Sequence, residues 1–204
     1  MRRETSTVVV LVGEVGEGLL AGLGQSTNVS VARAPVAEGH QSAEERTPPR
    51  PGWERGAMAM REAARRGATY VIVPDDPLAD VAAAWRAMWD VPGGPGGPAR
   101  FEEQAAEVLA AWRDKRFELP DYYLVVAPVL EEGTGPELYL GPLRAARPRR
   151  VAVAGIDAGS GQTARVLDAL RSLEHGPWWP PLDELIGVAR RFYAGGLAET
   201  QPAG

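Results

Sequence analysis

Continuous runs of β-branched residues constrain the fold of this chain more than any other feature. Val8–Val12 is apolar throughout, and Val71–Val73, Tyr123–Val126 and Val151–Ala154 have the same character. A strand with one wet face alternates polar and apolar residues, so these runs predict strands that are buried on both faces. Buried strands of that kind are typical of parallel sheets that are covered by helices.

Helical patterns separate these runs. They cover residues 57–66, 77–90, 100–117, 163–173 and 182–193, and two weaker strand patterns lie at 28–32 and 137–140. Strands that alternate with helices indicate right-handed βαβ crossovers. We therefore predict a three-layer α/β fold with a mainly parallel sheet of five or six strands, of flavodoxin-like or Rossmann-like architecture.

Irregular segments set the expected domain organisation. We predict a single domain over residues 1–195, exposed loops at 34–56 and 91–99, and a flexible tail at 196–204. The Gly- and Pro-rich segment 91–99 also suits an interdomain linker. Dividing the chain there would leave two thin cores of about three strands each, which favours one domain.

The residue inventory excludes several kinds of chemistry. The chain has no cysteine, one lysine (Lys115) and two histidines (His40 and His175). Thiol catalysis and cysteine-based zinc sites are therefore impossible. A Walker A loop is excluded too, because Lys115 lies late in a predicted helix and not in a Gly-rich loop.

Charge and hydropathy set expectations about partners and location. The net charge is −5, which argues against nucleic-acid and anionic-membrane partners because both favour a basic surface. No apolar run approaches the roughly 18 residues of a membrane span. We expect a cytoplasmic protein.

Small and polar residues follow three of the predicted strands. In open α/β sheets, ligands bind beyond the carboxyl ends of the strands. The candidate ligand-binding residues are accordingly Gly13, Glu14, Gly16, Gly18, Asp75, Asp157 and Ser160. The glycine spacing is G-x-x-G-x-G, which differs from the dinucleotide-binding G-x-G-x-x-G. The same glycines also suit a plain turn between strand and helix, and Asp76 suits a helix N-cap.

Carboxylates at three strand ends suggest a metal site. Glu14, Asp75 and Asp157 come from different strands, and three oxygen ligands suit a divalent metal such as Mg²⁺. The alternative is that these side chains are helix caps and solvated turns. No other cofactor is indicated by the sequence.

Two adjacent tryptophans, Trp178 and Trp179, join the last two predicted helices. A two-helix corner does not readily bury both, so one of them would contact a partner protein or a second copy of the chain.

Two functions follow from these observations. The first is binding of a small, anionic ligand or a protein partner without catalysis. The alternative is a metal-dependent enzyme that acts on a phosphorylated or otherwise anionic small molecule, with Glu14, Asp75 and Asp157 as metal ligands.

Overall fold

Five parallel strands form one sheet at the centre of the protein. The computed structural model describes residues 6–35, 50–90, 97–128, 138–156 and 161–200. The strands are β1 (Thr7–Gly13), β2 (Val29–Val31), β3 (Tyr70–Val73), β4 (Tyr122–Pro128) and β5 (Val151–Ile156). Their order across the sheet is β2-β3-β1-β4-β5. The parallel α/β fold predicted from the sequence is therefore confirmed.

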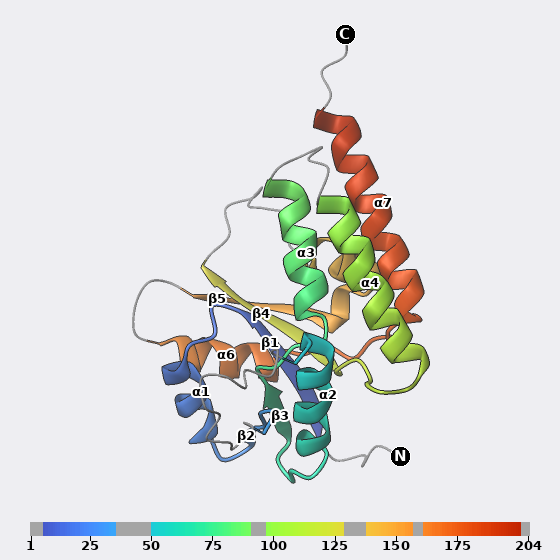
Figure 1. Cartoon of the computed structure of the whole chain (residues 1–204). Helices are drawn as coiled ribbons and strands as arrows, with labels where there is room; N and C mark the ends of the chain where they lie inside the picture. Colours follow the sequence, from blue (N-terminus) through green and yellow to red (C-terminus); the bar gives the residue numbers. More distant parts are fainter. Residues whose placement is uncertain (1–5, 36–49, 91–96, 129–137, 157–160, 201–204) are drawn as a thin grey trace, which may run out of the picture.

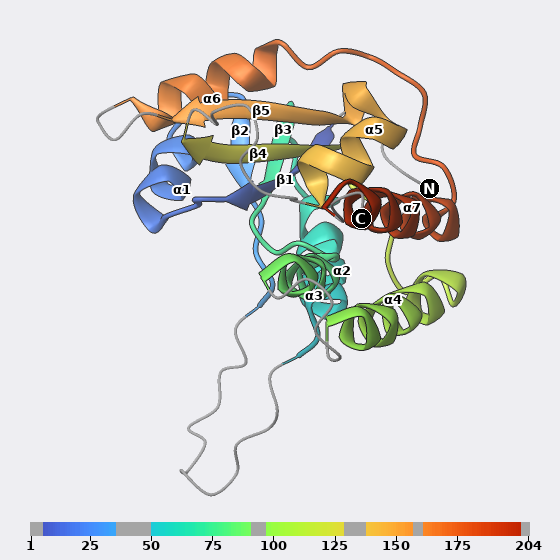
Figure 2. The ribbon, with the colours of Figure 1, turned by 90° about the horizontal axis from the view of Figure 1, so that it is seen from above.

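Helices cover both faces of this sheet (Figures 1 and 2). One face carries α1 (Glu17–Gly24) and α6 (Gln162–Arg171). The other carries α2 (Gly52–Ala63), α3 (Ala79–Asp90), α4 (Gly97–Arg113), α7 (Leu182–Thr200) and the π-helical turn η1 (Tyr139–Leu143). The turn η1 continues into the short helix α5 (Arg144–Ala146), and the 3₁₀ turn η2 (Pro148–Arg150) follows. The protein thus has three layers.

The central strand β1 shows why its sequence is continuously apolar. Val8, Val10 and Val12 pack into the core on the α2 side, whereas Val9 and Leu11 pack into the core on the α1 side. Because successive side chains of a strand point to opposite faces, both sets must be apolar when both faces are covered.

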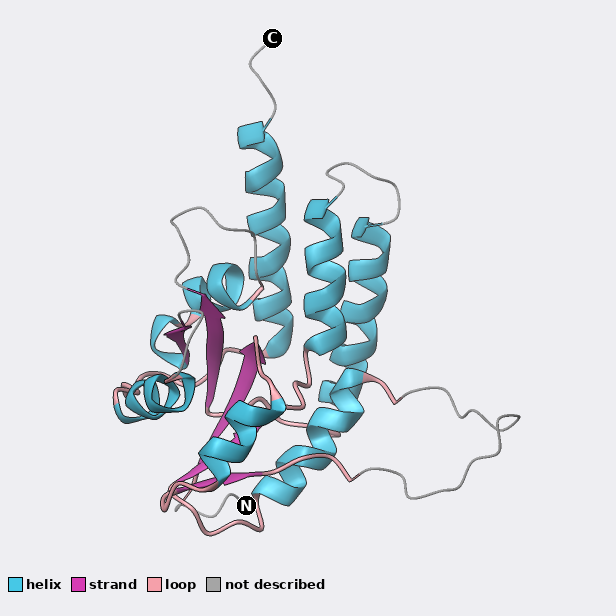
Figure 3. Ribbon diagram, turned by 90° about the vertical axis from the view of Figure 1, so that its left-hand side faces the viewer, coloured by secondary structure: helices cyan, strands magenta, loops and turns pink. Residues whose placement is uncertain are grey.

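An aromatic cluster joins the helices α3, α4 and α7. These helices are labelled in Figure 1 and stand side by side in Figure 3. Trp85 of α3 is fully buried and makes edge-to-face contacts with Trp89, Phe101 of α4 and Tyr193 of α7. Such pairs contribute about 0.5–1.5 kcal/mol each beyond the area they bury. The cluster therefore fixes these helices against one another. No helix among the described residues has the length and apolar character needed to span a membrane.

Helix α2 begins earlier than the sequence suggested. It starts at Gly52, inside the predicted loop 34–56, because the Gly52 N–H donates to the Asp80 carboxylate of α3 at 2.6 Å and so satisfies the helix end. Helix α4 likewise begins at Gly97, inside the predicted loop 91–99. Residues 36–49 and 91–96 lie outside the described part of the chain.

Two further expectations differ from the structure. Helix α7 continues to Thr200, through most of the predicted tail 196–204, and Gly196 allows the ring of Trp89 to pack closely against it. The predicted strand at 137–140 is instead part of η1 in its described portion. Pro142 has no N–H for the Leu138 carbonyl, so the Leu143 N–H donates to that carbonyl at 3.1 Å and the turn becomes π-helical.

Candidate functional site

The turn after β1 contains one glycine that the fold requires. Gly13 has a φ of +96°, and a Cβ there would lie 2.2 Å from the Val126 carbonyl oxygen. The Glu14 N–H donates to that same oxygen at 2.8 Å. At Gly16 and Gly18, by contrast, a Cβ would meet nothing within 4 Å. Gly13 thus has a structural role, whereas the turn leaves open space at the other two predicted ligand-binding glycines.

The carboxylates near this turn differ in their partners. Glu17 forms a two-point ion pair with Arg33 at 2.9 and 2.6 Å, and the hydrogen bonds from Arg33 lower the pKa of Glu17. Glu14 is exposed. Asp75 accepts a hydrogen bond from the Ala34 N–H at 2.9 Å and lies 3.9 Å from Nε of Arg55. Asp75 therefore holds the chain that leaves β2, a role that the sequence did not suggest.

The structure does not test the predicted metal site of Glu14, Asp75 and Asp157 as a set. Asp157 and Ser160 lie outside the described residues. Over the ranges that are described, no group of three acidic or histidine side chains is arranged to hold a metal ion. The three-carboxylate site stays a prediction.

Asp76 is the buried acidic residue at this edge of the sheet. Its carboxylate accepts a hydrogen bond from the Leu78 N–H at 2.9 Å, in the way expected of a helix cap, and another from the hydroxyl of Tyr139. Only 7% of the residue is exposed, and this burial raises the pKa of Asp76 to about 6. The sequence indicated the cap but not the burial, because Tyr139 comes from a distant segment.

Tyr123 lies beside this buried carboxyl. Burial, followed by the charge of Asp76, raises the pKa of the Tyr123 hydroxyl well above its usual value. Among the described residues, none forms a hydrogen bond with the Tyr123 hydroxyl. Asp76, Tyr123 and Tyr139 are therefore part of the core where β4 and η1 pack.

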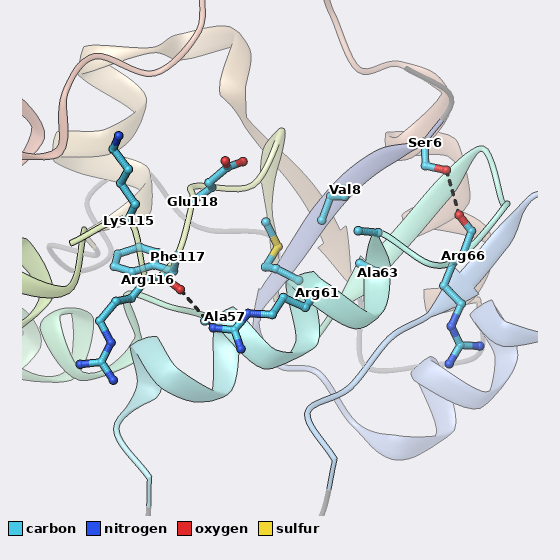
Figure 4. A pocket seen from close by; sticks show the side chains of 12 residues that line it. Ser6, Val8, Ala57, Arg61, Ala63, Arg66, Lys115, Arg116, Phe117 and Glu118 are labelled. Atoms are coloured by element: carbon cyan, nitrogen blue, oxygen red, sulfur yellow. Dashed lines mark hydrogen bonds between the residues drawn. The ribbon is translucent and has the colours of Figure 1, made fainter. Parts of the chain in front are cut away.

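A cavity of about 420 Å³ opens at the opposite edge of the sheet, where the strands begin (Figure 4). It lies between α2, the start of β1 and the segment that joins α4 to β4. Its apolar floor is formed by Val8, Ala57, Met60, Ala63, Ala64 and Phe117. Its polar lining is formed by Ser6, Arg61, Arg66, Lys115, Arg116 and Glu118. We call these six residues the cavity rim.

The cations of the cavity rim are unequally neutralised. Arg66 is paired with Glu62 at 2.9 Å. Arg61 donates to the Arg116 carbonyl at 3.4 Å, and the Arg116 guanidinium stacks on Trp53 at 4.2 Å. Among the described residues, Arg61, Lys115 and Arg116 form no ion pair with a carboxylate. The rim therefore concentrates uncompensated positive charge on a protein whose net charge is −5.

Lys115 has an unusual backbone conformation at this rim. Its φ is +57°, the only positive value at a non-glycine residue in the described chain. The Arg116 N–H donates to the Ala111 carbonyl, and the Lys115 N–H donates to the Trp112 carbonyl, both at 2.9 Å. This is the Schellman pattern that ends a helix, in which glycine normally takes the position of Lys115. Helix α4 thus ends with a strained lysine at the cavity.

The two tryptophans that join α6 to α7 are buried to different extents. Trp179 is 5% exposed and donates from Nε1 to the Pro120 carbonyl at 2.7 Å. Trp178 is 43% exposed, and the Arg150 guanidinium stacks on it at 4.9 Å. Arg150 also donates to the carbonyls of Gly176 and Pro177 at 2.7 and 3.0 Å. These hydrogen bonds hold the segment between α6 and α7 beside the start of β5. The predicted partner contact of the pair stays a prediction.

Comparisons with known proteins add little to this geometry. No family model matches the sequence, and no curated protein matches it. One solved structure similar in fold is the crystal structure of NadR protein in complex with NR, with a TM-score of 0.46 and 16% identity. The match covers 87% of this chain and 55% of that one. The chain thus spans about half the length of that protein.

Proposed function

We propose that this protein binds a small organic anion, without catalysis, in the cavity between α2, β1 and the α4–β4 connection. The observation that carries this proposal is the set of three rim cations, Arg61, Lys115 and Arg116, that lack carboxylate partners within the described residues. An anion in the cavity would supply the missing partners. Its volume of about 420 Å³ lies within the range of small-molecule sites.

The lining supports binding more than chemistry. Of its twelve residues, ten are cationic or apolar, and the other two are Glu118 and Ser6. The Ser6 hydroxyl donates to the Arg66 carbonyl at 3.3 Å. These two side chains provide no nucleophile paired with a general base, the arrangement that covalent catalysis requires. A binding protein is therefore the function that this cavity fits best.

Calorimetric titration with 1-naphthalenesulfonate tests the proposal. This probe combines a negative charge with an apolar body. We expect saturable binding that weakens at least about tenfold in Arg61→Gln, because a hydrogen bond to a charged group contributes about 1.5–3 kcal/mol. Arg65→Gln is the matched control, since Arg65 lies just after the end of α2, pairs with Glu62 at 3.2 Å and does not line the cavity.

Two outcomes would contradict the proposal. Equal weakening in Arg61→Gln and Arg65→Gln would mean that the probe responds to overall charge and not to the cavity. Absence of saturable binding to the folded protein would remove the site altogether. Circular dichroism of each variant establishes that the comparison is made between folded proteins.

A further inference from the structure

The cations of the cavity rim do not converge on one place. The Arg66 guanidinium is paired with Glu62. The Arg116 guanidinium stacks on Trp53, which does not line the cavity. Figure 4 shows the Lys115 and Arg116 side chains pointing in opposite directions. The rim therefore offers these cations separately and not as a cluster around one charged group.

Arg61 is the rim cation that lies beside the apolar floor. Its side chain runs along α2 toward Ala57, one of the floor residues (Figure 4). Its Nη2 donates to the Arg116 carbonyl at 3.4 Å, and this bond holds the guanidinium against the segment that joins α4 to β4. No carboxylate among the described residues pairs with it. Arg61 thus brings to the floor of the cavity a positive charge that is positioned but not neutralised.

The shape of the guanidinium decides what Arg61 can bind. A guanidinium carries five N–H donors in one plane, and two of its edges each present a parallel pair of donors. The bond to the Arg116 carbonyl uses one N–H of Nη2, which belongs to only one of these edges. The other edge keeps both of its donors. A planar carboxylate, with two oxygens on one carbon, matches such a pair.

The rest of the cavity is apolar or already paired. Its floor is formed by Val8, Ala57, Met60, Ala63, Ala64 and Phe117. At the end where Ser6 and Arg66 lie in Figure 4, the Ser6 hydroxyl donates to the Arg66 carbonyl at 3.3 Å. Because Glu62 neutralises Arg66, a second anionic group would meet no unpaired cation among the described residues at that end. A ligand that matches this cavity has an apolar body and a single charge at one end.

From these observations we infer that the ligand is a monocarboxylic acid with an apolar body, its carboxylate held by the complete edge of the Arg61 guanidinium and its body on the cavity floor. This inference rests on the proposed function and names its ligand class. Two parallel charge-assisted hydrogen bonds fix the carboxylate in orientation as well as in position. Lys115 and Arg116 add to the positive potential around the cavity but do not contact the carboxylate.

The decisive experiment compares two probes that share a body and a charge. At pH 7.5, 1-naphthoate and 1-naphthalenesulfonate are both monoanions, but the charge lies on two coplanar oxygens in the first and is spread over three in the second. In a calorimetric titration we expect the naphthoate to bind about tenfold more tightly, because its oxygens match the paired donors of Arg61.

A variant that keeps the charge assigns this preference to the planar head group. Arg61→Lys replaces the guanidinium with a point charge that has no paired donors. It should weaken binding of the naphthoate about tenfold and so bring the two affinities together. Arg65→Lys is the matched control and should leave the preference unchanged. Circular dichroism of both variants checks that they are folded.

Two further probes examine the charge and the body of the ligand. 1,4-Naphthalenedicarboxylate places a second carboxylate at the far end of the same body, where the described residues offer no unpaired cation, so it should bind more weakly than 1-naphthoate. 1-Naphthamide has the same planar shape without the charge and should bind more weakly too.

The possible failures are distinct. If the sulfonate binds with sensitivity to Arg61→Gln, but the naphthoate binds no more tightly, the carboxylate inference is wrong and anion binding stands. A preference for the naphthoate that persists in Arg61→Lys would also overturn the inference, because it would place the carboxylate elsewhere. Tighter binding of the dicarboxylate would show that the ligand is not a monoanion. If neither aromatic monoanion binds the folded protein, both the inference and the proposed function are wrong.

Discussion

The two edges of the sheet use charged residues in opposite ways. At the edge where strands end, the carboxylates of Glu17, Asp75 and Asp76 each have partners that hold a loop or a helix in place. At the edge where strands begin, the cations Arg61 and Lys115 lie around a cavity without carboxylate partners among the described residues. These three carboxylates at the first edge thus stabilise the fold, whereas these two cations at the second edge lack carboxylate partners among the described residues.

This difference matters because the first edge is where ligands usually bind in open α/β sheets. A charged side chain at a strand end has two competing uses, as a cap or anchor for the chain and as a ligand contact. Asp75 illustrates the first use, since its oxygens engage Ala34 and Arg55. The proposed binding residues are therefore the cations at the second edge that have no carboxylate partner among the described residues, and not the carboxylates at strand ends.

The largest expected effect tests whether the first edge is structural. Gly13→Ala should lower the free energy of unfolding by about 3 kcal/mol or more, because alanine is strained at a φ of +96° and its Cβ would overlap the Val126 carbonyl. Urea unfolding measures the change. Gly16→Ala is the control, since Gly16 has a φ of −89° and open space around it. Equal losses in both variants would contradict this account of the turn.

A smaller effect concerns the buried carboxyl at the same edge. The pKa of Asp76 rises from 3.8 to about 6 on folding, so the folded protein binds the proton more tightly than the unfolded chain does. Stability from this group is therefore complete below pH 4 and is lost as the pH rises to about 6, by roughly 2–3 kcal/mol. Asparagine keeps an oxygen for the Leu78 N–H without the charge. Asp76→Asn should gain stability relative to the natural protein as the pH rises from 4 to 7.

Urea unfolding of both proteins at several pH values provides the measurement. The difference between them isolates Asp76 from the other groups that titrate. Asp76→Ala removes the acceptor for Leu78 and the partner of Tyr139, and should lose about 1–3 kcal/mol at pH 4. A difference between the asparagine variant and the natural protein that does not change with pH would show that Asp76 is not protonated on folding.

The sequence predicted the parts of the fold that depend on local pattern. Val8–Val12 predicted a strand covered on both sides, and β1 is buried in that way. The π-helical turn Tyr139–Leu143 was missed because the pattern at 137–140 suggested a strand, whereas Pro142 has no N–H for the Leu138 carbonyl and the Leu143 N–H takes its place. Burial of Asp76 was missed for the related reason that Tyr139, its partner, is distant in the sequence.

The cavity was missed because no single segment contains it. Its lining comes from residues 6–8, 57–66 and 115–118, which meet only when α2 and α4 pack beside β1. The isolated lysine was the available signal, since Lys115 is the one lysine in an arginine-rich chain and lies late in a predicted amphipathic helix. Nothing in its residue type indicates a positive φ, which lysine seldom adopts.

The smallest expected effect examines whether the second edge gives up stability for binding. Lys115→Gly should raise the free energy of unfolding by about 0.5–1 kcal/mol, because glycine adopts a φ of +57° without strain at the end of a helix. Lys115→Ala removes the same charge but keeps the strain, so it should not stabilise the protein. Both variants should weaken binding of 1-naphthalenesulfonate to a similar degree in a calorimetric titration. Equal stabilisation by alanine and glycine would instead assign the effect to relief of repulsion among the rim cations. Stabilisation by glycine alone, together with weaker binding, would show that the lysine is kept at this strained position at the expense of the fold.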